Sequence, residues 1–326
     1  MRLVRIPALL LALFALPLLA QPAPPVVSPG ATLETLFEEG VFTEGPAAAP
    51  DGTVYFSDIT GSARSKSAGH IMRYDPRGGA VSVYRSPSGM ANGIIFDLEG
   101  RMVVAEGADF GGRRVTRTEM ASGRSESLAS LFEGRHFNSP NDVTIDARGR
   151  IYFSDPRYVG HEPIEMPVMA VYRIDPDGAV RMVVSDAGKP NGLAVSPDQK
   201  TLYVASGDNG ATGALPKGMA PLPGRSAILA YDLAEDGTTK LRSVLAPQGA
   251  DGLTVDTAGN VYAAAGSKGV LVYSPEGREI AQIATPVSTT NVEFSRGEGP
   301  SYLYITGGKG LYRIRVDVRG YHPADK

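Results

Sequence analysis

Apolar and polar residues alternate in short runs along most of the chain, and polar turns separate these runs. In DVTIDARGRIYFSDP, residues 142–156, an alternating run is followed by a polar turn with glycine and by a second run with an aromatic centre. A period of two broken by such a turn predicts two antiparallel strands joined as a hairpin. The same pattern recurs in five other segments: AAAPDGTVYFSDI, GIIFDLEGRMVVAEG, GLAVSPDQKTLYVASG, GLTVDTAGNVYAAAG and VEFSRGEGPSYLYITGG.

Further hairpins lie between these repeats and bring each unit to four strands. Examples are HIMRYDPRGGAVSVYRS, AVYRIDPDGAVRMVVSD and GVLVYSPEGREIAQIAT. Units of four short strands at a period of about 40 to 60 residues are typical of β-propellers, whose blades bury their faces only by stacking around a channel. A parallel α/β fold is the alternative, but after residue 20 we find no run of ten or more residues with the apolar period of a helix. We therefore predict an all-β, six-bladed propeller over residues 31–320.

The two ends of the predicted propeller suggest how its ring closes. After SYLYITGG and GLYRIRVDV the last unit lacks one strand, whereas ATLETLFEEG, residues 31–40, stands unpaired before the first unit. We expect this N-terminal segment to supply the outermost strand of the last blade, because an open sheet edge invites unwanted pairing. Residues 321–326 are left as a C-terminal tail.

The N-terminal twenty residues, MRLVRIPALLLALFALPLLA, have a basic start and an apolar centre too short to span a bilayer comfortably. They predict a cleaved signal peptide, residues 1–20, and a periplasmic or secreted protein without a membrane attachment after cleavage. The following QPAPPVVSPG, residues 21–30, predicts a flexible, proline-rich lead-in. The absence of cysteine excludes disulfides and lipid attachment through cysteine.

Composition and charge narrow the class of partner. Charged residues make up 21% of the chain, the formal net charge is −3, and neither sign dominates a long run. These values argue against binding to nucleic acid or to an acidic membrane surface. We expect a monomer that acts on a small molecule.

One polar position precedes or begins the first strand of every predicted unit. Successive positions are 48, 49, 50, 60 and 40 residues apart, which is one per blade. In a propeller these equivalent positions face a single axis, and buried polar groups there need a shared partner. The six residues are Glu44, Asn92, Asn141, Asn191, Asp251 and Asn291.

This set offers carboxylate and amide oxygens, which are hard donors. Such donors suit Ca²⁺, which accepts six to eight oxygen ligands in irregular geometry. Mg²⁺ and Mn²⁺ remain alternatives, and Zn²⁺ fits less well because the chain has no cysteine and four scattered histidines. Two further interpretations stay open: the side chains cap turns, or the ion only closes the propeller.

The motifs together resemble a known family. They are TEGPAAAPDGTVYFSD, FGGRRVTR, FNSPNDVTIDARGRIYFSDP, KPNGLAVSPDQKTLYVA, ADGLTVDTAGNVY, TTNVEF and LYITGG. In this order they resemble the family of gluconolactonases, senescence marker protein and luciferin-regenerating enzyme over residues 31–318. A more distant similarity is to diisopropyl fluorophosphatase and paraoxonase. The resemblance implies metal ligation by Glu44, Asn141, Asn191 and Asp251, an acid/base role for Asp251, and a channel lined by Asn92 and Asn291.

The chemistry of the set favours hydrolysis of a lactone. A divalent ion can polarise the lactone carbonyl, and a neighbouring carboxylate can accept the proton of the attacking water. Asp251 is our candidate base; Asp142 is the competitor, or else orients Asn141. His136 is a candidate substrate contact near the channel mouth. The senescence-marker branch has an arginine where this chain has Ser139, which leaves the preference for sugar lactones open.

Two alternatives to a lactonase remain. The first is a non-catalytic propeller that binds a ligand or protein and uses Ca²⁺ as a structural clasp, because fold alone does not decide function. The second is a phosphotriesterase-like hydrolase, because the same ion would polarise a phosphoryl oxygen.

Overall fold

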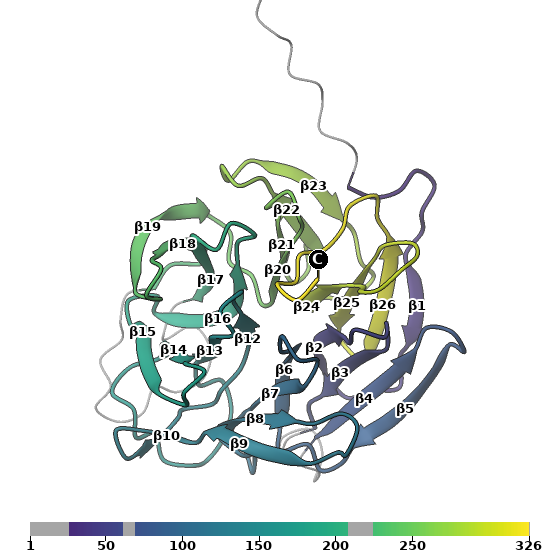
Figure 1. Ribbon diagram of the computed structural model, residues 1–326. Helices are drawn as coiled ribbons and strands as arrows, with labels where there is room; N and C mark the ends of the chain where they lie inside the picture. The colour runs from purple at the N-terminus through teal and green to yellow at the C-terminus, as the bar shows by residue number, and fades with distance from the viewer. Residues whose placement is uncertain (1–25, 61–68, 208–223, 326) are drawn as a thin grey trace, which may run out of the picture.

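The computed structural model describes residues 26–60, 69–207 and 224–325. Six four-stranded antiparallel sheets are arranged in a ring around a central axis (Figure 1), and every regular element in the described part of the chain is a strand. This confirms the prediction of an all-β, six-bladed propeller. The predicted signal peptide, residues 1–20, lies outside the described residues. Within the described ranges, no helix has the length and apolar character needed to cross a membrane.

Each blade runs outward from its first strand at the channel. The strands of blades one to three are β2 (Thr43–Ala48), β3 (Val54–Asp58), β4 (His70–Asp75), β5 (Ala80–Arg85), β6 (Ala91–Phe96), β7 (Met102–Glu106), β8 (Arg114–Thr118), β9 (Ser125–Ala129), β12 (Val143–Ile145), β13 (Ile151–Asp155), β14 (Ala170–Ile174) and β15 (Val180–Val184). Those of blades four to six are β16 (Lys189–Val195), β17 (Thr201–Gly207), β18 (Ala227–Leu233), β19 (Thr239–Ala246), β20 (Leu253–Val255), β21 (Val261–Ala264), β22 (Val270–Tyr273), β23 (Glu279–Ile283), β24 (Thr289–Phe294), β25 (Tyr302–Gly307), β26 (Gly310–Arg315) and β1 (Glu34–Phe37). A small hairpin, β10 (Leu131–Phe132) and β11 (Arg135–His136), connects blades two and three.

The N-terminal strand closes the ring as the sequence predicted. β1 pairs antiparallel with β26, which gives the last sheet the order β1-β26-β25-β24. Glu34 lies opposite Arg313, and the carboxylate accepts a hydrogen bond of 2.8 Å from the guanidinium. The strand covers the edge that β26 would otherwise expose, and it joins the two ends of the chain within one blade.

A repeated aspartate fixes the turn between the first two strands of three blades. In blade three, Asp146 Oδ1 accepts hydrogen bonds from the amides of Arg148 and Arg150 at 2.9 and 3.0 Å. Gly149 takes the left-handed conformation that the turn requires, with φ of 76°. Asp97 and Asp256 form the same pair of contacts in blades two and five. This local chemistry explains why the D-x-x-G pattern recurs along the sequence.

The core lies between the blades, where the second strand of a blade is buried on both faces. β3, β7, β13 and β21 are buried throughout, whereas β5, β9 and β23 are largely exposed. Aromatic rings fill the wedges between neighbouring sheets. Between blades two and three, the ring centroids of Phe137 and Phe153 are 5.0 Å apart in an edge-to-face contact.

Residues 26–30 correct part of the sequence interpretation, which assigned all of residues 21–30 to a flexible lead-in. Val26 is buried in the core of the last blade, and its carbonyl accepts a hydrogen bond from the amide of Asp317. Val27 forms a β-bridge with Val316. The apolar valines therefore extend the closure that β1 makes, although prolines surround them in the sequence.

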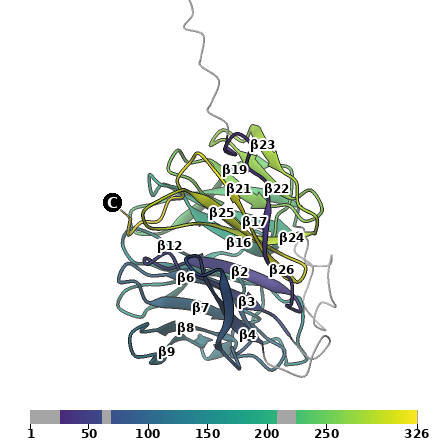
Figure 2. The same cartoon turned by 90° about the vertical axis from the view of Figure 1, so that its right-hand side faces the viewer.

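The C-terminal segment likewise packs against the propeller instead of standing free as a tail. It lies on one face of the molecule, at the front in Figure 1 and at the left in Figure 2. The amide of Tyr321 donates to the carbonyl of Val255 at the end of β20, and Asp325 forms an ion pair with Arg296. His322 Nε2 lies 2.8 Å from the carbonyl of Phe96 at the end of β6. The segment thus joins the last residues of two inner strands at one mouth of the channel.

His322 should make this C-terminal clasp sensitive to acid. As Nε2 contacts the Phe96 carbonyl, Nδ1 accepts from the amide of Ala324, so the neutral imidazole satisfies both contacts. Burial and the nearby Arg296 guanidinium lower the pKa of His322 to about 4. A lowered pKa means that His322 binds fewer protons in the folded state than in the unfolded state. The neutral side chain therefore contributes fully to stability above pH ~6.5, and this contribution is lost as the pH falls toward 4.

We expect the free energy of unfolding to fall by about 2 kcal/mol through this group between pH 7.5 and pH 5. His322→Gln keeps an amide donor for Phe96 but does not titrate in this range. Urea unfolding of both proteins at the two pH values measures the effect. The stability gap between wild type and variant should shrink at pH 5, and a gap that is equal at both pH values would contradict the assignment.

Candidate active site

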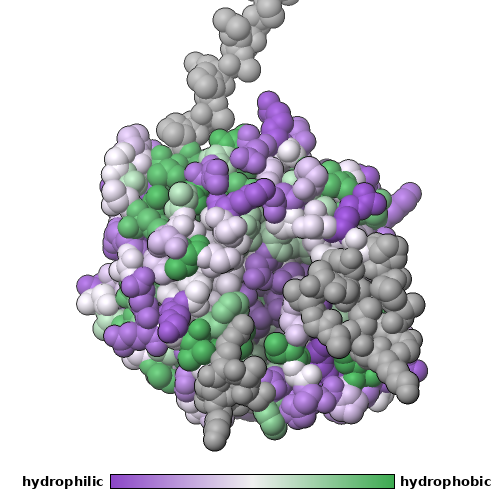
Figure 3. All heavy atoms as spheres, turned by 180° about the vertical axis from the view of Figure 1, so that it is seen from behind, coloured by the Kyte–Doolittle hydropathy of each residue, from purple (hydrophilic) through white to green (hydrophobic). Residues whose placement is uncertain are grey.

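The six sequence-predicted positions gather at the other mouth of the channel, where the inner strands begin. Four of them lie within β2, β6, β16 and β24, and the other two precede β12 and β20 by two residues. The pairing register shifts at the site residues of all four of these strands, for example between Glu44 and Ala47 and between Pro190 and Leu193. Such bulges turn a side chain out of the regular alternation of a strand and toward the axis. Figure 3 shows this face, on which hydrophilic side chains gather near the centre.

Glycines after the site residues let neighbouring inner strands meet. A Cβ on Gly45 would lie 2.0 Å from the carbonyl oxygen of Asn92, and one on Gly192 would lie 2.3 Å from that of Asp251. Instead, the amide of Gly192 donates to the Asp251 carbonyl at 2.8 Å. Only glycine permits this approach, and it fixes the backbone of one site residue against the next. The recurrent E-G, N-G and D-G dipeptides in the sequence have this structural cause.

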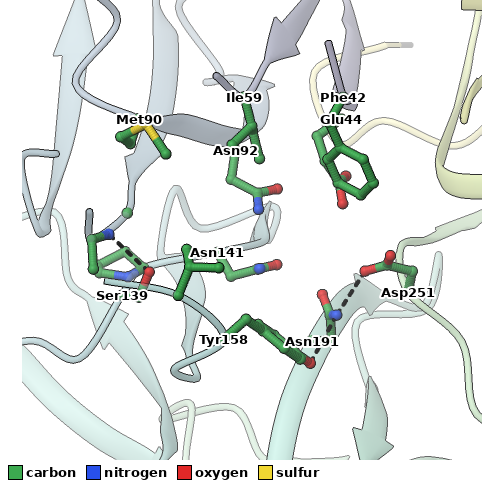
Figure 4. A pocket seen from close by; sticks show the side chains of 14 residues that line it. Phe42, Glu44, Ile59, Met90, Asn92, Ser139, Asn141, Tyr158, Asn191 and Asp251 are labelled. Carbon is green, nitrogen blue, oxygen red and sulfur yellow. Dashed lines mark hydrogen bonds between the residues drawn. The ribbon is translucent and has the colours of Figure 1, made fainter. Parts of the chain in front are cut away.

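Five of the predicted side chains direct oxygen atoms toward a common space. Figure 4 shows the carboxylates of Glu44 and Asp251 and the amide oxygens of Asn92, Asn141 and Asn191 turned toward one another. Asn191 Nδ2 donates to Asp251 Oδ1 at 2.6 Å. Among the described atoms, Asn92 Oδ1 is buried and accepts no hydrogen bond. The arrangement therefore contains an unsatisfied acceptor beside two carboxylates.

The electrostatics of this group call for a positive charge. Glu44 and Asp142 are buried, at 3% and 5% exposure. Asp251 lines the cavity and is partly exposed. Burial raises the pKa of Asp251 and of Asp142 to about 7. Burial and then the charges of Asp251 and Asp142 raise the pKa of Glu44 well above its usual range. Each ionised carboxylate thus opposes the others, and a bound cation would relieve this repulsion.

The residues present fit a divalent cation with oxygen ligands. No cluster of three or more acidic, histidine or cysteine side chains with metal-binding geometry occurs in the described ranges. The donors would instead be two carboxylates, Glu44 and Asp251, with amide oxygens completing the set. Carboxylate and amide oxygens without histidine or cysteine are the donor set of Ca²⁺ or Mg²⁺.

A cavity of about 210 Å³ opens above these oxygens. Its floor is polar, and its walls come from residues that follow the second strand of a blade or precede the first. Lining residues that the sequence interpretation missed are Phe42, Ile59, Met90, Gly107, Ala108, Pro140, Tyr158 and Val159. Because the strands of a hairpin are antiparallel, the end of a second strand lies beside the start of the first. That topological rule would have identified Ile59, Gly107 and Tyr158 as candidates.

Tyr158 contacts the predicted site residues directly. Its hydroxyl accepts a hydrogen bond of 3.0 Å from Asn191 Nδ2 (Figure 4). Burial and the Asp251 carboxylate raise the pKa of the phenol, which therefore keeps its proton. The ammonium of Lys189 lies 4.3 Å from the centroid of the Tyr158 ring. A neutral hydroxyl is thus held where it can donate into the cavity.

Three predicted residues lie outside the cavity lining. Asp142 and Asn291 are buried close beneath it, where Asp142 Oδ2 accepts from the amide of Leu193 at 2.9 Å and Oδ1 lies 3.4 Å from Asn291 Nδ2. His136 was expected near the channel mouth, but it is exposed in β11, and its amide donates to Glu165. The β10–β11 hairpin carries it away from the axis, which sequence spacing alone does not reveal.

Comparisons with known proteins agree with this fold. The family model of the SMP-30/Gluconolactonase/LRE-like region matches residues 42–309. A gluconolactonase of Zymomonas mobilis is 26% identical over 318 residues, which cover 88% of this chain and 82% of the relative. The solved gluconolactonase structure from Xanthomonas campestris is 28% identical, with a TM-score of 0.74 over 90% of this chain and 95% of that one. Regucalcin from Agrobacterium tumefaciens, a calcium-binding protein, shares the fold at 19% identity and a TM-score of 0.69, over 89% of this chain and 96% of that one.

Proposed function

The chain belongs to the SMP-30/gluconolactonase/LRE-like family, and from this membership we propose that it is a lactonase that requires a divalent cation, with Ca²⁺ as the preferred ion. Two relatives that are named gluconolactonases support a lactone as the substrate class. The observation that carries the metal requirement is the set of oxygens from Glu44, Asn92, Asn141, Asn191 and Asp251 around one space at the base of a cavity. A bound divalent ion would polarise the lactone carbonyl.

The side chains of this site supply the remaining chemistry. Asp251 is the base that accepts the proton of the attacking water, because its carboxylate lines the cavity and Asn191 holds one of its oxygens at 2.6 Å. Asp142 is less suitable, because it does not line the cavity and the Leu193 amide engages one of its oxygens. Tyr158 donates a hydrogen bond to an oxygen of the substrate, and the apolar walls exclude other water.

We also propose that the protein is exported and acts in the periplasm or outside the cell. The N-terminal sequence carries this proposal alone, because its residues lie outside the described structure. A monomer would be sufficient, because one chain contributes every residue of the site.

Hydrolysis of lactones by chelator-stripped protein tests the proposal. Protein beginning at residue 21 is treated with chelator and then supplied with Ca²⁺, Mg²⁺, Mn²⁺ or Zn²⁺. We expect kcat/KM for δ-valerolactone and D-glucono-δ-lactone to fall by at least about a hundredfold on stripping and to return with Ca²⁺. Each rate is corrected for uncatalysed hydrolysis, and a phosphotriester is assayed in parallel.

Three outcomes would redirect the proposal. Equal rates of lactone hydrolysis in chelator and in Ca²⁺ would show that the activity does not require a metal. Turnover of the phosphotriester alone would favour the second hydrolase class. A rise in melting temperature with Ca²⁺, without turnover of any ester, would favour a binding propeller whose ion is structural.

A further inference from the structure

We infer that the substrate is a lactone with an apolar substituent on its ring, and that this substituent lies in the 210 Å³ cavity against Ile59, Met90 and Val159. The inference rests on the proposed lactonase activity and concerns which lactone the site takes. A polyhydroxylated sugar lactone would place its hydroxyls against the same surface.

The walls of the cavity are apolar on the side away from Asp251. They are built by Ile59 after β3, Met90 before β6, Pro140 before β12 and Val159 after β13. The described lining includes no arginine, lysine or glutamine. Buried hydroxyls without partners weaken binding, whereas methylene groups gain from the same surface. The cavity therefore separates a polar floor for the ester from an apolar wall for its substituent.

The one serine among the described residues of this wall already holds the backbone in place. Ser139 Oγ accepts a hydrogen bond of 2.9 Å from the amide of Ala108, which joins the loop after β7 to the segment before β12. A Cβ on Gly107 would lie 2.9 Å from the same oxygen, so the contact is closely packed. Ser139 thus serves the construction of the wall.

Backbone strain is concentrated at the apolar wall. Met90 in the wall has φ of 60°, and Asp109 and Phe110, in the loop that follows the lining residues Gly107 and Ala108, have φ of 70° and 67°. The amide of Gly107 donates to the carbonyl of Met90 at 2.8 Å, which locks the two loops together. Strained backbone persists where the surroundings enforce it, and it gathers at ligand sites. The wall is therefore preformed.

Half of the described hydroxyl side chains in the neighbouring cavity already have acceptors for their protons. It has a volume of about 480 Å³ and meets the first cavity at Phe42, Tyr158, Asn191 and Asp251. Three of its hydroxyl side chains already donate their protons to main-chain carbonyls, and these are Ser206 to Ala187, Thr289 to Gly269 and Thr290 to Thr43. A polyhydroxylated ring would meet the hydroxyl donors of Tyr158, Ser226 and Ser288 among the described residues of this cavity.

Exposed apolar side chains lie in the two loops beside the wall, where the Phe110 ring packs against His161 with centroids 4.3 Å apart. Val159 is 44% exposed and Phe110 is 66% exposed. Their loops are joined, because Glu162 accepts hydrogen bonds from the amides of Asp109 and Phe110. Exposed apolar residues beside a cavity are typical of a binding surface. A substituent that leaves the cavity thus meets further apolar surface.

A pair of lactones that differ only in the substituent tests the inference. δ-Octalactone is δ-valerolactone with a propyl group on the ring. Each buried methylene raises binding about fourfold, so we expect kcat/KM for δ-octalactone to exceed that for δ-valerolactone by at least about tenfold. We expect D-glucono-δ-lactone to be no better than δ-valerolactone once each rate is divided by that of uncatalysed hydrolysis.

Substitutions at the wall provide the matched controls. Val159→Thr preserves the shape of the side chain but replaces a methyl group by a hydroxyl. It should lower the ratio of kcat/KM for δ-octalactone to that for δ-valerolactone at least about threefold. Ile59→Thr should lower the same ratio. Val83→Thr makes the same change at an exposed position of the outer strand β5 and should leave the ratio unchanged.

The outcomes separate this inference from the proposed function. If kcat/KM were equal for δ-octalactone and δ-valerolactone, or higher for D-glucono-δ-lactone, the inference of an apolar substituent would be wrong. The proposed lactonase activity would still stand. If no lactone were hydrolysed with any of the ions, both the proposed lactonase activity and the inference that rests on it would be wrong. A tenfold preference that falls in Val159→Thr but not in Val83→Thr would support both.

Discussion

Asp251→Asn should reduce kcat/KM for lactone hydrolysis by about a thousandfold or more while leaving the fold intact. The carboxylate lies at the floor of the cavity, where it is one of two acidic groups among the described residues that face the proposed ion. Asparagine has the same shape and can still accept the hydrogen bond that Asn191 donates at 2.6 Å in the wild type. The substitution therefore removes charge and basicity without opening a hole in the structure.

Three measurements distinguish a role of Asp251 as the base from a role as a metal ligand alone. Activity is assayed at saturating Ca²⁺, Ca²⁺ affinity is measured by calorimetry, and circular dichroism checks the fold. Asp142→Asn tests the competing base and should cost less activity, because Asp142 lies outside the cavity lining. Asp177→Asn, at an outer turn of blade three, is the matched control and should behave as wild type. A larger loss in Asp142→Asn than in Asp251→Asn would reassign the base.

The sequence predicted the fold because local chemistry repeats once per blade. Asp97, Asp146 and Asp256 each fix the same hairpin turn through contacts within a few residues. The six polar positions were predictable for a related reason: each begins an inner strand, and all inner strands begin at the same mouth of the channel. Periodic spacing is therefore converted directly into spatial proximity.

The apolar half of the site was not predictable from the same pattern. Met90 and Val159 lie in loops of different length and sequence, and Met90 takes a left-handed backbone conformation that its residue type does not suggest. Tyr158 reaches Asn191 only because the loop after β13 folds back over the channel. Val26 and His322 similarly obtain partners from strands far away in the sequence. Tertiary contacts made by single residues have no repeating pattern in the sequence, whereas the turns repeat once per blade.

Glu44→Gln should separate the effect of the ion from the effect of the side chain on stability. Glu44 is 3% exposed, and burial together with the charges of Asp251 and Asp142 raises its pKa well above the usual range. Glutamine keeps the size of the side chain but removes the charge that attracts the cation. We expect Ca²⁺ affinity to fall by about a hundredfold or more and the Ca²⁺-dependent rise in melting temperature to disappear.

The same substitution should have the opposite sign in chelator. Without a cation, an ionised Glu44 repels two buried carboxylates, so Glu44→Gln should be at least as stable as wild type in chelator and less stable in Ca²⁺. Glu293→Gln is the matched control, because Glu293 is another carboxyl whose pKa burial raises, to about 7, but it does not line the cavity. It should retain the wild-type response to Ca²⁺. Calorimetric melting curves of the three proteins in chelator and in Ca²⁺ provide the test. An equal loss of stability for Glu44→Gln under both conditions would show that Glu44 acts through packing alone, because only an ion can reverse the sign.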